Sequence, residues 1–418
     1  MNTPLPTTAY TGPGATAAGR ASFLAARRKA ALRALALALP LLVFLLVTFV
    51  APIASLLARS VQNPEVRHGM PHLSAALAAW SGVGVPGESV FSALAVDLKR
   101  ASENSQLGDI ARRMNFYQPE YRSLLFKTAR AVRAQTPAQW KPALIDLDAR
   151  WGDTETWRLL RRASQSPTPD YLLNAVDAQV APDGAVAQVA AGSAVYRAAF
   201  ARTVAISASV TLLCLLLGYP VAYLLATLPE KQSSRLMMFV IVPFWTSLLV
   251  RSTAWYVLLQ PGGVINSALL RLGVIHEPVP LIFNRTGVLI GMTHILLPYM
   301  ILAIYSVMKN VSPSYMRAAK SLGAHPAVAF VRVYVPQTFP GVGAGCFLVF
   351  VLALGYYITP ALLGGAGDEM ISQLIAEQTN DQLNWGLAGA LSCYLVIFTG
   401  VFYFVFNRLV GIDRLRFG

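Results

Sequence analysis

Aromatic and acidic residues gather in the segment that starts at Leu354 and reads LGYYITPALLGGAGDEMISQLIAEQ. Tyr356 and Tyr357 lie upstream of the acidic pair Asp368 and Glu369. Carboxylates attract cations, and the faces of tyrosine rings attract them too, so this combination suits an organic amine. A solvent-exposed loop has the same composition, and composition alone favours that structural interpretation.

Arg251 is an ionisable residue within the apolar stretch PFWTSLLVRSTAW. A charged side chain at the centre of a bilayer costs at least about 3 kcal/mol, so Arg251 must face a protein interior, pair with an acid or extend toward the interface. We favour pairing or extension to the interface, and a direct role in transport is the alternative.

Other kinds of chemistry find no support in the sequence. The Walker A pattern G-x4-G-K-[ST] is absent, so the chain has no P-loop for ATP, and no nucleophile–base signature indicates an enzyme. Cys214, Cys346 and Cys393 lie in apolar runs and are expected to be small core residues. The histidines do not form a metal-binding pattern. We therefore expect no metal site and no cofactor on this chain, and we do not expect it to be an enzyme.

The composition is that of a membrane protein. Apolar residues make up 55% of the 418 residues and charged residues only 13%, against about a quarter in soluble domains. The formal charge of +14 could suit nucleic acid, but basic residues flank the apolar runs, as in membrane proteins, and no nucleic-acid motif accompanies them. We predict an all-α protein with six transmembrane helices, roughly at Ala34–Leu57, Val204–Leu225, Leu236–Leu258, Thr286–Val307, Gly341–Pro360 and Trp385–Phe406.

Two kinds of residue mark how these spans pack. Gly341 and Gly345 are one turn apart and predict a close helix–helix contact. Pro220, Pro243 and Pro298 predict kinks within spans, which fit either pore-lining helices or irregular packing.

A helix–turn–helix is predicted between the fourth and fifth spans, at residues 312–340. A serine–proline pair begins the first helix, and Gly323 is suited to end it in a left-handed conformation. Pro326 begins a second helix, which we expect to end at Pro336 and Pro340. Helices this short are unstable alone in water, so the segment must dock against a partner.

This segment resembles the EAA loop of ABC-importer permeases, E-A-A-x3-G-x9-I-x-L-P. The match runs from Arg317, which replaces the acidic residue of the family, to Pro336. The stretches GYPVAYLLA, PFWTSLLVR and ITPALLGG, with a later NWG, resemble the spermidine/putrescine branch of these permeases. The resemblance covers roughly residues 195–415.

The resemblance implies a type I ABC importer fold in a bacterial inner membrane and a pathway for a small solute, here a polyamine such as putrescine or spermidine. It implies as partners an ABC ATPase dimer that binds ATP and Mg, a second permease subunit and a periplasmic substrate-binding protein. Coupling to the ATPase is then expected at Arg317, Ala318, Ala319, Leu322, Gly323, Ala324 and Pro336. The substrate pathway is expected at Trp245, Arg251, Tyr356, Tyr357, Asp368, Glu369 and Trp385.

The remaining parts of the chain lie outside the permease core, which we place at 196–418. Residues 1–33 are basic, contain no acidic residue and are expected to form a flexible cytoplasmic arm. The first span, 34–57, is too long for a typical signal peptide, which is the competing interpretation. Residues 58–195 carry dense charges and amphipathic helical patterns, so we predict a helical periplasmic insert whose tryptophans form a core. Under the resemblance, this insert is longer than the corresponding loop of the best-known polyamine permeases.

Basic flanks and the six predicted spans place both termini and the segment 312–340 in the cytoplasm.

Three alternative functions remain. An importer of another small organic solute, amino-acid-like or opine-like, would share the fold. A secondary transporter would show inverted repeats, and a membrane-anchored sensor would need a cytoplasmic signalling domain.

Overall fold

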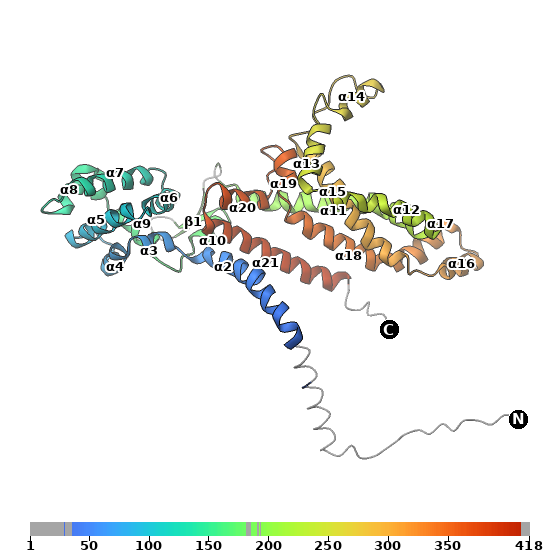
Figure 1. The fold of residues 1–418 in the computed structure, drawn as a ribbon, viewed down its shortest axis with the longest axis horizontal. Helices are drawn as coiled ribbons and strands as arrows, with labels where there is room; N and C mark the ends of the chain where they lie inside the picture. Colours follow the sequence, from blue (N-terminus) through green and yellow to red (C-terminus); the bar gives the residue numbers. More distant parts are fainter. Residues whose placement is uncertain (1–28, 30–35, 181–184, 190–191, 193, 411–418) are drawn as a thin grey trace, which may run out of the picture. The chain divides into compact units, whose positions relative to one another are not determined.

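The computed structural model describes residues 29, 36–180, 185–189, 192 and 194–410. The predicted basic arm, apart from Lys29, and the last basic flank at Arg414 and Arg416 lie outside these residues. The first apolar helix runs over Ala36–Val61 and contains η1 (Leu46–Val50), α2 (Ala51–Ala58) and η2 (Arg59–Val61). Its mean hydropathy reaches 2.7, as expected of a helix that spans a membrane, and Figure 1 shows α2 in blue.

The predicted insert is helical, as its amphipathic patterns indicate. Its elements are α3 (Pro64–Gly69), α4 (Pro71–Ala79), α5 (Glu88–Glu103), α6 (Leu107–Tyr117), α7 (Tyr121–Ala134), α8 (Trp140–Leu147), η3 (Ala149–Gly152), α9 (Thr154–Ser164) and α10 (Asp170–Asn174). A two-stranded antiparallel ribbon comes next, β1 (Ala178–Val180) and β2 (Val186–Gln188), with Gln179 opposite Ala187. The all-α prediction does not include this short ribbon.

Two tryptophans occupy the centre of the insert. Trp151 and Trp157 are fully buried, with ring centres 5.2 Å apart. The indole of Trp157 donates to the carbonyl of Trp151, and the indole of Trp151 donates to the hydroxyl of Thr128. Trp80 and Trp140 pack at the edge of the same cluster. The prediction that the tryptophans form a core is confirmed.

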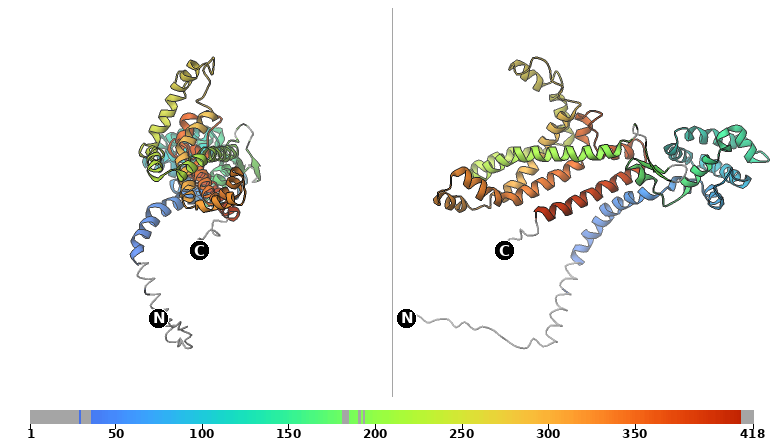
Figure 2. Two further views of the ribbon diagram at one scale, coloured as in Figure 1. Left: turned by 90° about the vertical axis from the view of Figure 1, so that its right-hand side faces the viewer. Right: turned by 180° about the vertical axis from the view of Figure 1, so that it is seen from behind.

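Three long helices form the centre of the membrane core: α11 (Tyr196–Thr227), α15 (Arg285–Met308) and α18 (Val335–Leu354) (Figure 2). Glycines allow their close approach. A Cβ on Gly341 would lie 2.9 Å from Cβ of Val307, and one on Gly345 would lie 2.7 Å from the sulfur of Met300. The predicted contact at these two glycines is therefore confirmed, and it joins α18 to α15.

The third predicted span is not one straight helix. It consists of α12 (Glu230–Ile241) and η4 (Val242–Trp245), followed after a bend of 97° by α13 (Leu248–Leu258). Pro243 cannot donate a backbone hydrogen bond, and the hydroxyl of Ser247 accepts from the amide of Val250 and so begins a new helix. The short helix α14 (Val264–Arg271) comes next.

The expectation that a short helix ends at Pro336 and Pro340 is wrong. One apolar helix continues over Pro326–Leu354, through α17 (Pro326–Ala329), the π-helix η5 (Phe330–Tyr334) and α18. Pro336 stands in the first turn of α18, where its missing N–H is of little consequence, and Pro340 is accommodated inside the helix.

The chain after this helix returns to the core in shorter pieces before the last span. These are α19 (Ile358–Leu363), α20 (Ile371–Asn380) and α21 (Trp385–Val410). Pro360, which we expected to end the fifth span, lies in α19 instead. The described residues contain five helices able to cross a membrane, and the bent pair α12–α13 makes a sixth if it is one span.

The insert packs on the last two helices of the core. The ring of Tyr171 in α10 lies so close to Gly386 that a Cβ there would be 2.2 Å from it. A shared hydrophobic cluster joins Tyr171 and Ala175 to Ile371 and Leu387. Glycine at 386 thus allows the insert to approach the start of α21.

Candidate functional site

The segment 312–340 forms the predicted turn between helices. α16 (Pro313–Ser321) begins at Ser312, whose hydroxyl accepts from the amide of Ser314. Gly323 has a φ of +85°, the left-handed conformation that favours glycine. The amide of Ala324 donates to the carbonyl of Ala319, which closes the helix end.

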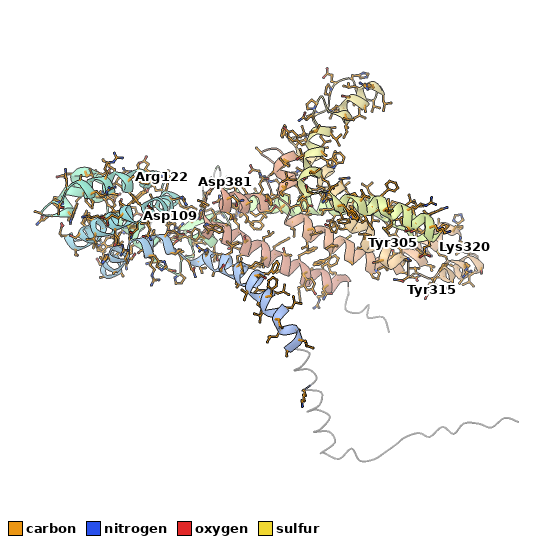
Figure 3. The ribbon with its side chains drawn as sticks, viewed as in Figure 1. Asp109, Arg122, Tyr305, Tyr315, Lys320 and Asp381 are labelled. Atoms are coloured by element: carbon orange, nitrogen blue, oxygen red, sulfur yellow. The ribbon has the colours of Figure 1, made fainter. Side chains whose placement is uncertain are left out.

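The outer face of this segment is exposed and partly apolar. Leu322 is 89% exposed, and Tyr315 and Val328 are also exposed. Arg317 and Pro336 share this exposure, whereas Ala319 and Ala324 are half-buried. Figure 3 shows Tyr315 and Lys320 on α16. The turn thus leaves apolar side chains uncovered by the described residues of this chain.

Aromatic rings fasten the same segment to the core. The ring of Tyr223, near the end of α11, contacts Phe330 and Tyr334 edge-on, with ring centres 5.2 and 5.4 Å away. The hydroxyls of Tyr219 and Thr338 are 3.0 Å apart. A movement of the segment would therefore reach α11 directly.

Arg251 lies on α13 next to several aromatic residues. It is close enough to Tyr356 and His294 for its charge to affect both. Its Nε and Nη1 are buried and have no hydrogen-bond partner among the described residues. The neighbouring Ser252 shares a 2.9 Å hydrogen bond with Thr359 of α19, which holds α13 against α19. Arg251 therefore lies within electrostatic range of Tyr356.

The acidic pair lies on the loop between α19 and α20. Asp368 is only 8% exposed, and its carboxylate accepts a 3.0 Å hydrogen bond from Nε of Arg285 at the start of α15. The backbone carbonyl of Glu369 accepts from Nε of Arg202 on α11. A Cβ on Gly365 would lie 2.5 Å from the carbonyl oxygen of Phe283, so the loop is pressed against the residues before α15. Ion pairing thus holds this loop in place.

The other predicted pathway residues are more scattered. Tyr357 is 42% exposed at the start of α19, and Trp245 is 89% exposed at the bend between η4 and α13. Trp385 lies apart from them, at the start of α21, where it lines a cleft next to the insert. The structure therefore gathers Arg251 and Tyr356 but separates Trp385 from both.

Arg285 is the functional candidate that sequence reasoning missed. It occupies the first position of α15, where the helix dipole disfavours a cation. A basic residue at such a position signals a nearby acid, and this signal could have indicated a partner for Asp368. No comparable pattern in the neighbouring sequence indicated that Tyr223 packs against Phe330 and Tyr334.

Known proteins resemble the membrane core of this chain. Among solved structures, a bacterial alginate ABC transporter in complex with an alginate pentasaccharide-bound periplasmic protein has a TM-score of 0.42 and 17% identity, over 51% of this chain and 77% of that one. The sequence pattern of the family described as "Binding-protein-dependent transport system inner membrane component" matches residues 216–412.

Two relatives are both named spermidine/putrescine transport system permease protein PotB. The one from Escherichia coli (strain K12) is 39% identical over 198 residues, which are 47% of this chain and 72% of the relative. The one from Haemophilus influenzae is 33% identical over 207 residues, which are 50% of this chain and 72% of the relative. The chain therefore belongs to the family of binding-protein-dependent transport system inner membrane components, as a multi-pass permease subunit of an ABC importer in the spermidine/putrescine branch.

Proposed function

We propose that this permease forms part of the membrane pathway for a small organic cation, putrescine or spermidine. The 39% identity to the PotB permeases is the observation that carries this assignment. The acidic loop at Asp368 and the tyrosines at 356 and 357 supply the carboxylate and aromatic faces that an amine needs. Arg251 repels cations, and Arg285 already pairs with Asp368, so in this proposal the amine binds Asp368 by displacing Arg285 from its carboxylate.

The energy for transport comes from partner subunits in this proposal. An ABC ATPase dimer hydrolyses ATP, a second permease subunit completes the pathway, and a periplasmic binding protein delivers the substrate. The exposed face of α16, with Leu322 at its end, is where the ATPase docks. The aromatic contacts of Tyr223 then pass the motion of the ATPase to α11.

Uptake by the assembled transporter tests the substrate. With the wild-type partners in proteoliposomes, we expect unlabelled putrescine or spermidine to compete with labelled putrescine. Amino acids, opines, sugars and inorganic anions at the same concentration should leave uptake unchanged. Competition by an amino acid or opine, without competition by polyamines, would show that the permease serves another small organic solute.

The proposed topology places residues 58–195 in the periplasm, and both termini and the segment 312–340 in the cytoplasm. His325 is exposed, so a His325→Cys variant without the native thiols can report its side of the membrane. An impermeant thiol reagent should label it only after the cells are opened. The matched variant Ser123→Cys, exposed on α7, should react in intact cells once the outer membrane is permeabilised. Labelling of His325→Cys from outside would contradict this topology.

A further inference from the structure

A cleft of about 540 Å³ lies where the insert meets the start of the last span. One wall belongs to the insert and includes Arg113 and Tyr171. The other wall belongs to the turn between α20 and α21 and includes Gln382. Figure 3 labels Asp109 on the first wall and Asp381 next to the second. Neither wall includes residues of the segment 312–340, called the coupling segment below, or of the acidic loop between α19 and α20.

The turn between α20 and α21 presents apolar side chains to the cleft. Leu383 has a φ of +53°, a conformation that is strained for leucine, and its side chain is 46% exposed. Trp385 is 41% exposed. The turn is nevertheless fixed, because the amide of Asn384 donates to the carbonyl of Gln378. A strained backbone that holds apolar side chains outward indicates a contact with another molecule.

The wall of the insert holds a buried cation with unused donors. The side chain of Arg113 is only 4% exposed, and its guanidinium carbon lies 4.1 Å from the ring centre of Tyr171. Nη2 donates to the hydroxyl of Tyr117, but Nε and Nη1 have no hydrogen-bond partner in the part of the chain that the structure describes. Burial raises the pKa of Tyr171, so its phenol stays neutral and does not balance the charge.

Asp170 lies behind this arginine, 4.0 Å from Nη2 of Arg113. Its carboxylate is already shared, because it accepts from the guanidinium of Arg162 and from the hydroxyl of Tyr117. Asp170 is therefore a weak counter-ion for Arg113.

The charges that line the cleft leave an excess of positive charge. Its charged residues are Arg59, Arg112, Arg113, Glu65 and Asp109. Arg112 and Asp109 lie 3.5 Å apart and neutralise each other. Two arginines then face one carboxylate, so the cleft favours an acidic group.

Amide side chains complete the lining. Asn115, Gln378 and Gln382 can each donate to and accept from a peptide backbone. Basic, amide and apolar groups together suit a protein loop that carries a carboxylate next to an apolar side chain.

The position of the cleft indicates which protein supplies this loop. Tyr196, which lines the cleft, begins α11, and Tyr223 near the other end of α11 holds the coupling segment. The cleft is therefore at the end of the core away from the ATPase side. The acidic loop is at the same end, because the hydroxyl of Thr203 accepts from the amide of Ile371.

We propose that this cleft is the docking site for an acidic loop of the periplasmic substrate-binding protein, which places its carboxylate next to Arg59 and Arg113 and an apolar side chain against Leu383 and Trp385. The inference rests on the proposed function, in which such a protein delivers the substrate. The insert then serves as half of the docking site.

The test uses the complete transporter in nanodiscs, with ATP hydrolysis measured against increasing concentrations of the polyamine-loaded binding protein. Arg59→Glu reverses an exposed charge of the cleft. Leu383→Asn removes the apolar side chain, and asparagine adopts the left-handed backbone conformation of this position more readily than most residues. We expect each change to raise the half-maximal concentration of binding protein at least tenfold. Hydrolysis without binding protein should stay unchanged. Arg130→Glu, an exposed charge reversal on α7, is the matched control and should behave as wild type.

Salt supplies a second measurement. An increase from 50 to 300 mM salt should raise the half-maximal concentration more for the wild type than for Arg59→Glu, because the variant has lost an ionic contact.

Wild-type half-maximal concentrations in both cleft variants would overturn the docking site while leaving the proposed function intact. Saturable binding of succinate to the transporter without binding protein, abolished by Arg59→Glu, would also overturn it in favour of a small-molecule site. No stimulation of the wild type by any polyamine-binding protein would instead overturn the proposed function.

Discussion

Gly323→Val should reduce transport and substrate-stimulated ATP hydrolysis to background while the membrane core remains folded. The φ of +85° at Gly323 is strained for a β-branched residue, at a cost of about 1–3 kcal/mol. Among the described residues, apart from its two chain neighbours, no atom lies within 4 Å of a Cβ at this position, so the cost is in the backbone and not in a clash with them. The turn should then lose its shape, and Leu322 would lose the exposed position from which it docks the ATPase in the proposed function.

Gly323→Asn is the matched control, because asparagine adopts the left-handed conformation far more readily than valine. We expect it to retain most of the transport activity. The measurements are putrescine uptake in proteoliposomes and copurification of the ATPase with the permease. Normal coupling in Gly323→Val would show that this turn is not the coupling element. Equal loss in both variants would point to a close contact with the partner at this position in place of backbone strain.

The conformation of the segment 312–340 could be predicted because its determinants are local. The serine–proline pair, Gly323 and Pro326 each set the conformation of their own neighbourhood, and the structure has the helix start, the turn and the second helix start at these residues. The predicted end of the second helix was wrong for the opposite reason. Whether Pro336 stops a helix or stands in its first turn depends on the conformation of the residues on both sides of it, and the π-turn of η5 has no clear local signal.

The candidate pathway was predicted less completely because it depends on contacts between distant residues. Arg285 and Asp368 are 83 residues apart in the chain, and only the packing of α15 against the loop before α20 brings them together. Trp385 was grouped with Arg251 because both lie in stretches that resemble the same family. It lines a cleft together with Arg113 and Tyr171 of the insert, and no pattern near Trp385 indicated that arrangement.

The second large effect is expected on uptake when the ion pair between Arg285 and Asp368 is changed. We predict that Asp368→Asn lowers putrescine uptake at least tenfold, because it removes the carboxylate that an amine would bind. Its effect on stability should be small. The side chain of Arg285 is 52% exposed, and partly exposed ion pairs contribute only about 0–1 kcal/mol. Arg285→Gln keeps the carboxylate and should therefore retain more uptake than Asp368→Asn.

The exchanged pair Arg285→Asp with Asp368→Arg separates a binding role from a structural one. If Asp368 receives the amine when the substrate displaces Arg285, the exchange should keep the thermal stability near that of the wild type without restoring uptake, because the carboxylate then stands on α15 and not on the loop. Uptake of labelled putrescine and the unfolding temperature of the purified complex measure the two effects separately. Full recovery of uptake in the exchanged pair would show that the ion pair only fastens the loop, and amine recognition would then have to lie elsewhere along the pathway.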